Sequence, residues 1–408
     1  MLDVARIRRR FPALAVGGPD GRAAVRADAP GGTQVVDTAI AAMADRLRQG
    51  TANQHGPFPT SRETDALCDR VRHQAARFLG SSPEGVVFGQ NMTTLTFHVA
   101  RALEDRFGAG DEIVCTRLDH DANVAPWLGL AERTGATVRW VDMDSDSGLL
   151  DLGSLDAAIS ERTRLVAFPA ASNALGTLVD PAPFVAAARA VGALTYLDAV
   201  HAAPHVPLDR RAAGVDLLVC SPYKFFGPHA GILAADPDVL AGLRPDRVRP
   251  GPDHGPERWQ TGTANFEAIA GIGGALSYLE EVGLAAIREH EIALSRRFLD
   301  GLDGMGHVRL YGPREPKRRT PTFAVTLEER TPKAVAGELA RAGIHVWDGH
   351  YYAIEPMRAL GLLDRGGAVR IGFAHYHGPE DIDRVLRALA DLSPRSAGGG
   401  CLEQRDIR

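Results

Sequence analysis

The 408-residue chain carries 46 basic and 51 acidic side chains, and apolar residues make up 45% of it, which are ordinary values for a globular protein. Its formal net charge of -5 gives no reason to expect binding to nucleic acid or to an anionic membrane. No stretch approaches the roughly 20 apolar residues that cross a bilayer, and the first residues lack the apolar core of a signal peptide, so we expect a cytoplasmic protein with no membrane partner.

Short apolar segments in the first half of the chain predict the strands of a parallel sheet. Turn residues bound them, and they alternate with Ala-rich segments of helical period such as residues 155–160 and 183–190. Strands that are apolar on both faces and separated by helices are typical of α/β folds. The predicted strands are residues 85–89, 112–115, 138–141, 164–168, 194–197 and 217–220.

The length of the chain predicts more than one packed unit. We expect a large domain over residues 29–265, preceded by a segment over residues 1–28 that packs on a smaller domain. Residues 266–302 form one long amphipathic stretch, which predicts a helix connecting the two domains. The smaller α+β domain then extends to residue 392, with strands at 322–326 and 368–373 and helices at 332–342 and 379–392.

The final residues, 393–408, contain three consecutive glycines and predict a disordered tail. The tail holds Cys401, whereas the other cysteines, Cys68, Cys115 and Cys220, are expected to be buried small hydrophobic residues. The four cysteines are far apart and show no CxxC spacing, so neither a disulfide framework nor a metal site is expected.

Lys224 is the first candidate for chemistry. Only three of the 46 basic residues are lysines, so an amine in an apolar segment suggests a need for amine chemistry, since a guanidinium stays protonated. Lys224 follows the predicted strand 217–220, at the edge where parallel sheets place ligands, and its aromatic neighbours would lower the pKa of its amine. From this segment alone, a lysine whose stem packs on aromatic rings while its head reaches water is an equally good interpretation.

Polar side chains follow other predicted strands as well. Asp198 ends one strand, where a buried carboxylate could keep a pyridine nitrogen protonated or could simply cap the next helix. Residues 90–94 open a helix whose amino terminus could seat a phosphate, although a threonine there is usually only a cap. His120 could stack on an aromatic ring and Asn173 could donate to a phenolate oxygen, but each alone is more often a satisfied core or turn residue.

The order of these residues resembles the class V aminotransferase family, which includes cysteine desulfurases, selenocysteine lyases and isopenicillin N epimerase-like enzymes. The resemblance extends from Pro30 to Arg370 and beyond, and the segments 221–229 and 261–265 are most similar to the cysteine desulfurase-like subgroup. It implies an enzyme that depends on pyridoxal 5'-phosphate (PLP). The implied α/β fold is the PLP-dependent transferase fold type I, with a mostly parallel seven-stranded sheet in the large domain and a smaller α+β domain.

The resemblance also implies a role for each residue. Lys224 would hold PLP as a Schiff base and act as the general base, Asp198 would pair with the pyridine nitrogen, and His120 would stack on the ring. Arg370 would bind the carboxylate of an amino-acid substrate through both of its terminal nitrogens. Thr263 would reach the phosphate of a neighbouring subunit, which implies a homodimer with shared active sites. The other residues expected at the cofactor are Met92, Thr93, Asn173, His201, Ser221 and Tyr223.

The chain departs from the family pattern at three places. The family commonly has Gln at the position of His201, and desulfurases usually have His at the position of Tyr223. Desulfurases also place a sulfur-accepting cysteine just after the segment that ends at His345, where this chain continues with residues 346–352 and has no cysteine. A persulfide relay needs a thiolate near the substrate sulfur, so desulfuration through an internal thiolate is not expected unless Cys401 supplies it.

β-Elimination from a cysteine S-conjugate or a related amino acid is therefore the leading hypothesis, releasing a thiol with pyruvate and ammonia. The alternatives are desulfuration with an external sulfur acceptor, transamination and epimerisation. A non-catalytic PLP-binding sensor would carry a DNA-binding extension, and the segment before residue 29 is too short to supply one. The loops expected to face the substrate contain Gly31 and Gly32, His55 and Gly56, and the cluster His350, Tyr351 and Tyr352, which is either an acid near the leaving sulfur or a packed aromatic loop.

Overall fold

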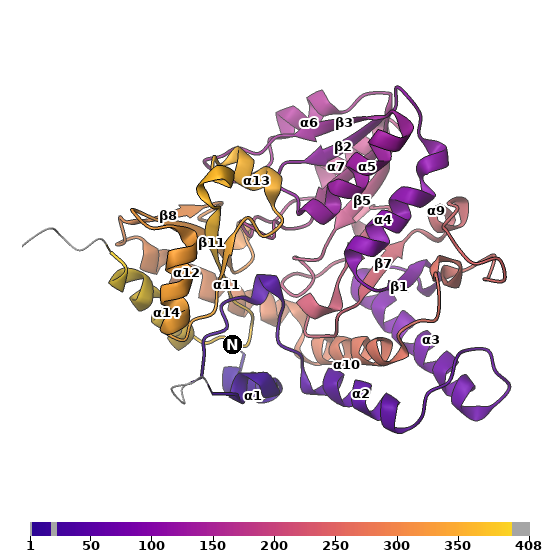
Figure 1. Cartoon of the computed structure of the whole chain (residues 1–408), viewed down its shortest axis with the longest axis horizontal. Helices are drawn as coiled ribbons and strands as arrows, with labels where there is room; N and C mark the ends of the chain where they lie inside the picture. Colours follow the sequence, from indigo (N-terminus) through magenta and orange to yellow (C-terminus); the bar gives the residue numbers. More distant parts are fainter. Residues whose placement is uncertain (1, 18–22, 394–408) are drawn as a thin grey trace, which may run out of the picture.

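The computed structural model describes residues 2–17 and 23–393 and contains two sheets (Figure 1). The larger sheet has seven strands in the order β1-β7-β6-β5-β4-β2-β3. The pairs from β6 to β3 are parallel, and β7 is antiparallel to both of its neighbours. The strands are β1 (Val86–Gly89), β2 (Glu112–Thr116), β3 (Thr137–Val141), β4 (Thr163–Pro169), β5 (Leu194–Asp198), β6 (Leu217–Cys220) and β7 (Gly231–Ala235).

This sheet confirms the predicted α/β fold with its mostly parallel seven-stranded sheet, and each of the six predicted strands is present within a few residues of its expected bounds. Strand β7 was not predicted. Its sequence, GILAA, is short and contains two alanines, and alanine carries little strand propensity. All five residues of β7 are buried, so packing on both faces of the strand stabilises it in the sheet although its residue types do not predict a strand.

Helices cover both faces of the larger sheet. Alternate strand residues face opposite sides: Val114 and Val166 pack in one core with α3, α7 and α10, while Ile113 and Leu165 pack in another with α4 and α5. The helices of this half are α2 (Asp37–Arg48), α3 (Pro59–Leu79), α4 (Met92–Ala102), α5 (Ala125–Thr134), α6 (Leu152–Ala158), α7 (Ala182–Ala190), α8 (Arg210–Ala213) and α9 (Pro237–Gly242).

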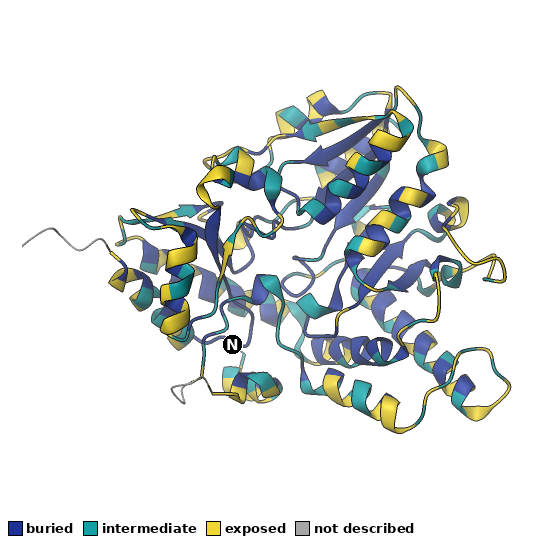
Figure 2. Ribbon diagram, viewed as in Figure 1, coloured by how far each residue is buried: buried dark blue, intermediate teal, exposed yellow. Residues whose placement is uncertain are grey.

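The predicted single helix over residues 266–302 is wrong in one respect. The structure has two helices there, α10 (Phe266–Val282) and α11 (Leu284–Leu302), which meet at Gly283. Gly283 has φ 82°, a left-handed value that glycine adopts without steric cost and that ends α10. Helix α10 packs against α2 and α3, and Figure 2 shows most of it in the buried colour.

The smaller sheet is antiparallel, in the order β10-β11-β9-β8. It packs with α11, α12 and α14 around a core of its own that contains Phe298, Phe323 and Ile371. The predicted strands and helices of this region are confirmed, while β8, β10 and α13 were not predicted. The elements are β8 (Val308–Tyr311), β9 (Thr322–Leu327), α12 (Pro332–Arg341), β10 (Trp347–Gly349), α13 (Ile354–Ala359), β11 (Ala368–Gly372) and α14 (Pro379–Asp391).

The N-terminal segment contacts both halves of the molecule. It begins with α1 (Val4–Arg9), and the Phe11 ring packs edge-on against Phe226 and Tyr278 in the core beneath the larger sheet. Val25, further along, pairs with Ile344 beside the smaller sheet. The division of the chain into domains stays a prediction, and the predicted disordered tail lies outside the described residues from residue 394 onward.

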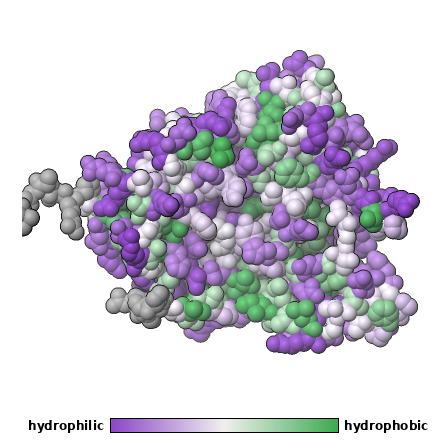
Figure 3. All heavy atoms as spheres, in the orientation of Figure 1, coloured by the Kyte–Doolittle hydropathy of each residue, from purple (hydrophilic) through white to green (hydrophobic). Residues whose placement is uncertain are grey.

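Cys68, Cys115 and Cys220 are all buried, as predicted, while Cys401 lies outside the described residues. On the face shown in Figure 3, hydrophobic residues form small separate groups among hydrophilic ones. Within residues 2–17 and 23–393, no helix combines the length and the apolar character that a membrane span requires.

Candidate active site

Lys224 ends a short 3-10 helix, η6 (Pro222–Lys224), that follows β6 directly. Its Nζ donates a hydrogen bond to the carbonyl of Pro30 and lies 4.7 Å from the centre of the Tyr223 ring. Burial lowers the pKa of the amine to about 7, with a further lowering by the charge of Arg370 and an opposing rise from Asp198. A large fraction of the amine is therefore neutral near pH 7, and neutral amines are nucleophiles.

The backbone around Lys224 is held by Thr33, which follows Gly31 and Gly32. The Thr33 amide and hydroxyl both donate to the carbonyl of Tyr223, and the Thr33 hydroxyl accepts from the amide of Phe226. Phe226 adopts φ 72°, a left-handed conformation that is unusual for a phenylalanine and is kept by these bonds and by the buried position of its ring. Lys224 is thus presented on a constrained loop and not on a free chain.

Asp198 ends β5, which pairs in parallel with β6, so Asp198 and Lys224 leave the same edge of the sheet. The carboxyl group is buried, with 6% of the residue exposed, and its Oδ1 accepts from the amide of Val200 at 2.8 Å. Burial raises the pKa of Asp198 to about 6, against the lowering effects of the Val200 amide and the charge of Lys224. The predicted juxtaposition of the amine and the carboxylate at one sheet edge is therefore present.

The amino terminus of α4 lies at the same edge. Asn91 caps this 11-residue helix, its Oδ1 accepting from the amide of Thr94, and the Met92 amide donates to the Ser221 hydroxyl at 3.2 Å. A Cβ at Gly231 would lie 2.4 to 2.9 Å from backbone atoms of Asn91, so only glycine on β7 lets the helix end come this close to the sheet. Thr93 is half-buried at the second position of the helix. The cap is Asn91, and the Thr94 hydroxyl donates back to it, so among these hydroxyls only that of Thr93, whose one contact is the sulfur of Met92, takes no part in the cap.

Arg370 on β11 is a buried cation beside Asn173. Its Nη1 donates to the backbone carbonyl of Asn173 at 3.0 Å, and its guanidinium lies 4.5 Å from the centre of the Tyr351 ring. Burial lowers its pKa to about 10, so it remains charged at neutral pH. Among the described residues, no carboxylate forms an ion pair with Arg370 and its Nε has no hydrogen-bond partner. A buried, unpaired guanidinium is suited to binding an anionic ligand.

His120 follows β2 and caps the short helix η5 (Asp121–Asn123), its Nδ1 accepting from the amide of Ala122. Burial, with the charges of Lys224 and Arg370, lowers its pKa to about 3, so the imidazole is neutral. Tyr352 stacks on this ring with centroids 5.6 Å apart and 30° between the planes. One face of the imidazole is thus covered by Tyr352.

The predicted cluster of His350, Tyr351 and Tyr352 does lie at this site. The Tyr351 carbonyl accepts from the Asn173 amide at 3.0 Å, and the Tyr352 amide donates to His350 Nδ1 at 3.1 Å. Both tyrosines have left-handed backbones, with φ 48° and 58°, which costs of order 1 to 3 kcal/mol each for residues other than glycine. Two such residues in succession mark a loop whose shape is fixed by its surroundings.

Gly31 and Gly32 lie between these elements. A Cβ on Gly31 would overlap the indole of Trp347, and a Cβ on Gly32 would lie 3.3 Å from the Tyr223 ring. The Tyr223 ring stacks on that of His229, with centroids 5.0 Å apart. The glycine pair is therefore needed where two aromatic side chains meet the loop that carries Pro30.

His201 is buried and is connected to the smaller sheet. Its Nε2 lies 3.0 Å from the hydroxyl oxygens of both Thr320 and Thr322. Four residues later, His205 Nδ1 lies 2.9 Å from a carboxylate oxygen of Glu291 on α11. Neither His205 nor Glu291 was predicted. The spacing of His201 and His205 was the available signal, because residues four apart share one face of a helical turn.

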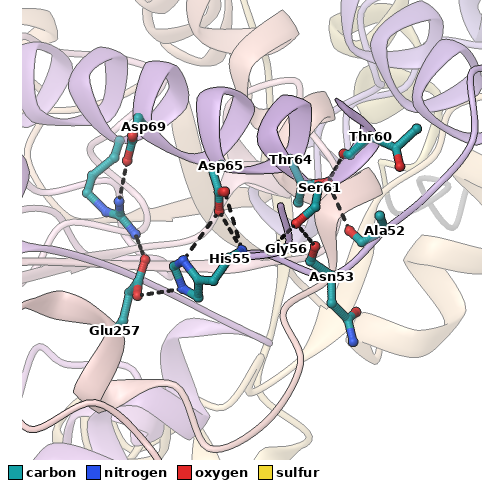
Figure 4. Close-up of polar contacts among 11 residues, drawn as sticks. Ala52, Asn53, His55, Gly56, Thr60, Ser61, Thr64, Asp65, Asp69 and Glu257 are labelled. Carbon is teal, nitrogen blue, oxygen red and sulfur yellow. Dashed lines mark hydrogen bonds and ion pairs between the residues drawn. The ribbon is translucent and has the colours of Figure 1, made fainter. Parts of the chain in front are cut away.

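Two predicted parts of the site, the loop of His55 and Gly56 and the residue Thr263, have no contact with Lys224 among the described residues. His55 lies in the loop between α2 and α3, where its ring is 3.3 Å from a Glu257 oxygen and 3.6 Å from an Asp65 oxygen, and Figure 4 shows it between these carboxylates. Ser61 holds the same loop by accepting from the Gly56 amide. Thr263 is exposed and lines a cavity of about 580 Å³ together with Gln90, Thr94 and His229.

The residues present fit PLP, the cofactor predicted from the sequence. A partly neutral amine, a buried carboxylate and a helix amino terminus with hydroxyl groups all lie at the same edge of the sheet. The Oδ1 atom of Asn173 is buried with no hydrogen-bond partner among the described residues, which is costly unless a ligand or water satisfies it. The donors and the unmet polar atom are those that a phosphorylated pyridine with an aldehyde and a hydroxyl group requires.

Comparison with known proteins supports this reading of the site. A family model described as Aminotransferase class-V matches residues 25–385. A probable cysteine desulfurase of Streptomyces coelicolor is 31% identical over 408 residues, covering 95% of this chain and 97% of the relative. A cysteine desulfurase of Klebsiella pneumoniae is 33% identical over 403 residues, covering 95% of this chain and 97% of the relative. The apo structure of a cysteine desulfurase from Thermococcus onnurineus is similar with a TM-score of 0.87 and 27% identity, covering 94% of this chain and 98% of that one.

Proposed function

The chain belongs to the class-V aminotransferase family and is a PLP-dependent enzyme, and on that premise we propose that it is a cysteine desulfurase-type enzyme that passes sulfur to an external acceptor. The observation that carries the catalytic part is the juxtaposition of a buried carboxylate, Asp198, with an amine, Lys224, whose pKa is lowered to about 7. The names of the similar proteins support the choice of cysteine as substrate.

PLP, when bound, links covalently to an amine and accepts electrons from the α-carbon of an amino acid into its ring. We assign the covalent link to Lys224, whose amine would also be the base for the α-proton of the substrate. Asp198 would keep a proton on the pyridine nitrogen of the bound cofactor, since a buried carboxylate is stabilised by an adjacent cation. The amino terminus of α4, with the hydroxyls of Thr93 and Ser221, would hold the phosphate of the cofactor.

Arg370 binds the carboxylate of the substrate. Its guanidinium is buried and charged, and the carbonyl of Asn173 fixes its position. Binding an anion there pairs a charge that has no carboxylate partner among the described residues, which is favourable in a site shielded from water. His120, neutral and stacked on Tyr352, would lie beside the cofactor ring, and Asn173, whose side-chain oxygen has no partner among the described residues, would supply a polar contact to it.

We assign the role of sulfur acceptor to a thiol outside the described residues, because the cysteines within them cannot act as thiolates. Cys68, Cys115 and Cys220 are buried, and burial raises the pKa of the Cys68 thiol to about 11 and that of the others further, so none is a thiolate at neutral pH. In the proposed step an external thiolate attacks the substrate sulfur, the carbon–sulfur bond breaks, a persulfide forms, and protons delivered to carbon give alanine.

β-Elimination, the leading hypothesis from the sequence, becomes the second candidate. The comparisons favour desulfuration, since the similar proteins are named cysteine desulfurases. One observation favours elimination. The loop of residues 347–352, which contacts His120 and Asn173, is aromatic and contains no cysteine that could accept sulfur. Transamination and epimerisation have no such support.

We also propose a homodimer in which Thr263 reaches the phosphate of the other subunit. Thr263 is exposed beside His229 and Gln90, at a cavity that opens next to the amino terminus of α4. His55 and Glu257 hold the neighbouring loop in place, so the exposed segment has a defined position for contact with a second copy.

The products formed from L-cysteine test the reaction. The holoenzyme with L-cysteine and an excess of dithiothreitol is expected to yield alanine and sulfide in equal amounts, at a rate that rises with the thiol concentration, and Cys401→Ser is expected to behave like the wild type. Mass spectrometry and sulfide assay follow both products. Pyruvate and ammonia in place of alanine would establish elimination, and loss of activity in Cys401→Ser would show that the acceptor is internal.

A further inference from the structure

Arg319 is a buried cation that the proposed function does not use. It lies just before β9 with 0% of its surface exposed, and burial lowers its pKa to about 9, so the guanidinium stays charged at neutral pH. Among the described residues, no carboxylate forms a hydrogen bond or an ion pair with it. A charge without a counter-ion is costly in the protein interior, so hydrogen bonds must compensate for the burial of Arg319.

Arg319 donates to three backbone carbonyls from separate parts of the chain. Its Nη1 donates to Pro313, which follows β8, and its Nη2 donates to Leu175 at 2.9 Å and to Thr322 at the start of β9. Leu175 belongs to the larger half of the molecule, in the loop between β4 and α7. The Phe323 ring lies beside the guanidinium, with 4.2 Å from Cζ to the ring centre. One side chain therefore joins a loop of the larger sheet to the ends of two strands of the smaller one.

The two segments joined in this way also contact each other directly. The Thr320 amide donates to the Gly176 carbonyl at 2.8 Å. Gly176 has φ 77°, and a Cβ on it would lie 2.5 Å from the Thr322 carbonyl oxygen, so glycine is needed for this approach. We call the contact between residues 172–178 and 318–322 the joint.

The joint contains residues of the proposed active site. Asn173 belongs to its first segment, and the Asn173 carbonyl accepts from Arg370 Nη1 at 3.0 Å. Arg370 lies on β11, which pairs with β9. In the second segment, the hydroxyls of Thr320 and Thr322 lie 3.0 Å from His201 Nε2. A shift at the joint would therefore move Asn173 and Arg370 relative to the rest of the site.

The amine and the guanidinium of the site come from opposite sides of the joint. Lys224 follows β6 of the larger sheet, and Arg370 lies on β11 of the smaller one. Burial lowers the pKa of the Lys224 amine, and the charge of Arg370 lowers it further, so the two groups act on each other across the site. A substrate must reach both groups, with its α-carbon at the amine and its carboxylate at the guanidinium. The spacing of the two sheets therefore decides how well an amino acid fits.

We propose that Arg319 is a positioning residue for the substrate: by holding the joint, it fixes Arg370 at the distance from Lys224 that an amino acid requires. This inference rests on the proposed function, in which PLP binds at Lys224 and the substrate carboxylate binds at Arg370. Without the three bonds of Arg319, the guanidinium of Arg370 keeps its charge but loses its fixed position. Substrate affinity should then fall, while the cofactor, which the larger sheet holds, stays bound.

Binding of L-alanine, the expected product, tests the proposal without turnover. The dissociation constant is read from the change that L-alanine produces in the visible spectrum of the holoenzyme. Arg319→Met removes the donors and keeps an unbranched apolar side chain, and it is expected to raise this constant by about tenfold or more with the cofactor band at full intensity. The KM for L-cysteine should rise by a similar factor, and kcat should fall less.

Arg210→Met is the matched control. Arg210 is also buried, and its Nη1 donates at 2.7 Å to the carbonyl of Val215, which lies at the end of β6 opposite to Lys224. Its replacement is expected to lower the melting temperature without changing the dissociation constant for L-alanine. An Arg319→Met protein that behaved in the same way would show a purely structural role and overturn the proposal.

Arg319→Lys keeps the charge but has one donor nitrogen in place of two. It is expected to retain most of the defect in binding L-alanine, and it carries the test if Arg319→Met does not fold. Wild-type affinity in Arg319→Lys would overturn the proposal. A wild-type protein that showed no visible band with PLP, or that did not bind L-alanine, would instead refute the proposed function and this inference with it.

Discussion

Lys224→Ala is expected to abolish the visible absorption band of the cofactor and to lower kcat/KM by about 10³-fold or more, because one substitution removes both the covalent link and the general base. The methyl group of alanine cannot condense with an aldehyde, and no second lysine replaces the lost amine, since the other two, Lys317 and Lys333, lie on the surface near the smaller sheet. Spectra of the purified variant mixed with PLP, together with product assays, provide the measurement.

Lys333→Ala supplies the control for this substitution. Lys333 is exposed on α12, and its loss should change neither the band nor the rate. A Lys224→Ala protein that retained a visible band of wild-type intensity would show that the cofactor is linked elsewhere, and one that retained wild-type turnover would remove Lys224 from the mechanism.

Asp198→Asn is expected to leave the cofactor bound but to lower kcat by about 10²-fold or more, the loss typical of removing one preorganised electrostatic partner. The amide has the same shape and can still accept from the Val200 amide, but it carries no charge to hold a proton on the pyridine nitrogen. Steady-state kinetics at saturating PLP, with the absorption spectrum as a check on cofactor content, measures the effect.

Asp236→Asn distinguishes this role from helix capping. Asp236 also follows a strand directly, and its carboxylate caps α9 by accepting from the Asp238 amide, so it is a strand-end aspartate with a purely local function. Its replacement should lower stability slightly without affecting the rate. If both variants lost activity equally, or if Asp198→Asn were as fast as the wild type, the pairing of Asp198 with the ring nitrogen would be wrong.

Much of the site could be predicted because the parallel sheet brings the residues at its strand ends close together. Asp198, His120 and Lys224 each follow a strand of the parallel region, and the carboxyl ends of parallel strands meet at one edge. The helix that opens after β1 places its amino terminus at the same edge for the same reason. Local patterns of apolar residues were therefore enough to bring residues that are more than 100 positions apart into one expected site.

The rest of the site depends on contacts that no local pattern encodes. The bond between Arg370 and the Asn173 carbonyl joins residues 197 positions apart, and the pair of His205 and Glu291 joins residues 86 apart. The loop that presents Tyr351 and Tyr352 in left-handed conformations contradicts the ordinary preference of tyrosine, so its shape comes from packing against His120 and Asn173. Strand β7 likewise depends on its pairing with β1 and β6.

The reaction itself was the least predictable feature. The missing cysteine in residues 346–352 led to a hypothesis of elimination, whereas the similar proteins favour desulfuration with an acceptor from elsewhere. Both reactions would use the amine of Lys224, the carboxylate of Asp198 and the guanidinium of Arg370. They differ in whether a nucleophile attacks the substrate sulfur or the sulfur leaves as a thiol. Residues that hold the cofactor therefore identify the family, and the residues or molecules at the sulfur decide the product.

Reduction of the holoenzyme with sodium borohydride, followed by peptide mapping, tests the central claim most directly, because reduction makes the link between PLP and its lysine permanent. The chain has only three lysines, so the assignment is unambiguous. The added mass of the reduced cofactor is expected on the peptide that contains Lys224 and on no other. Label on the peptides of Lys317 or Lys333, or the absence of any labelled lysine, would contradict the account.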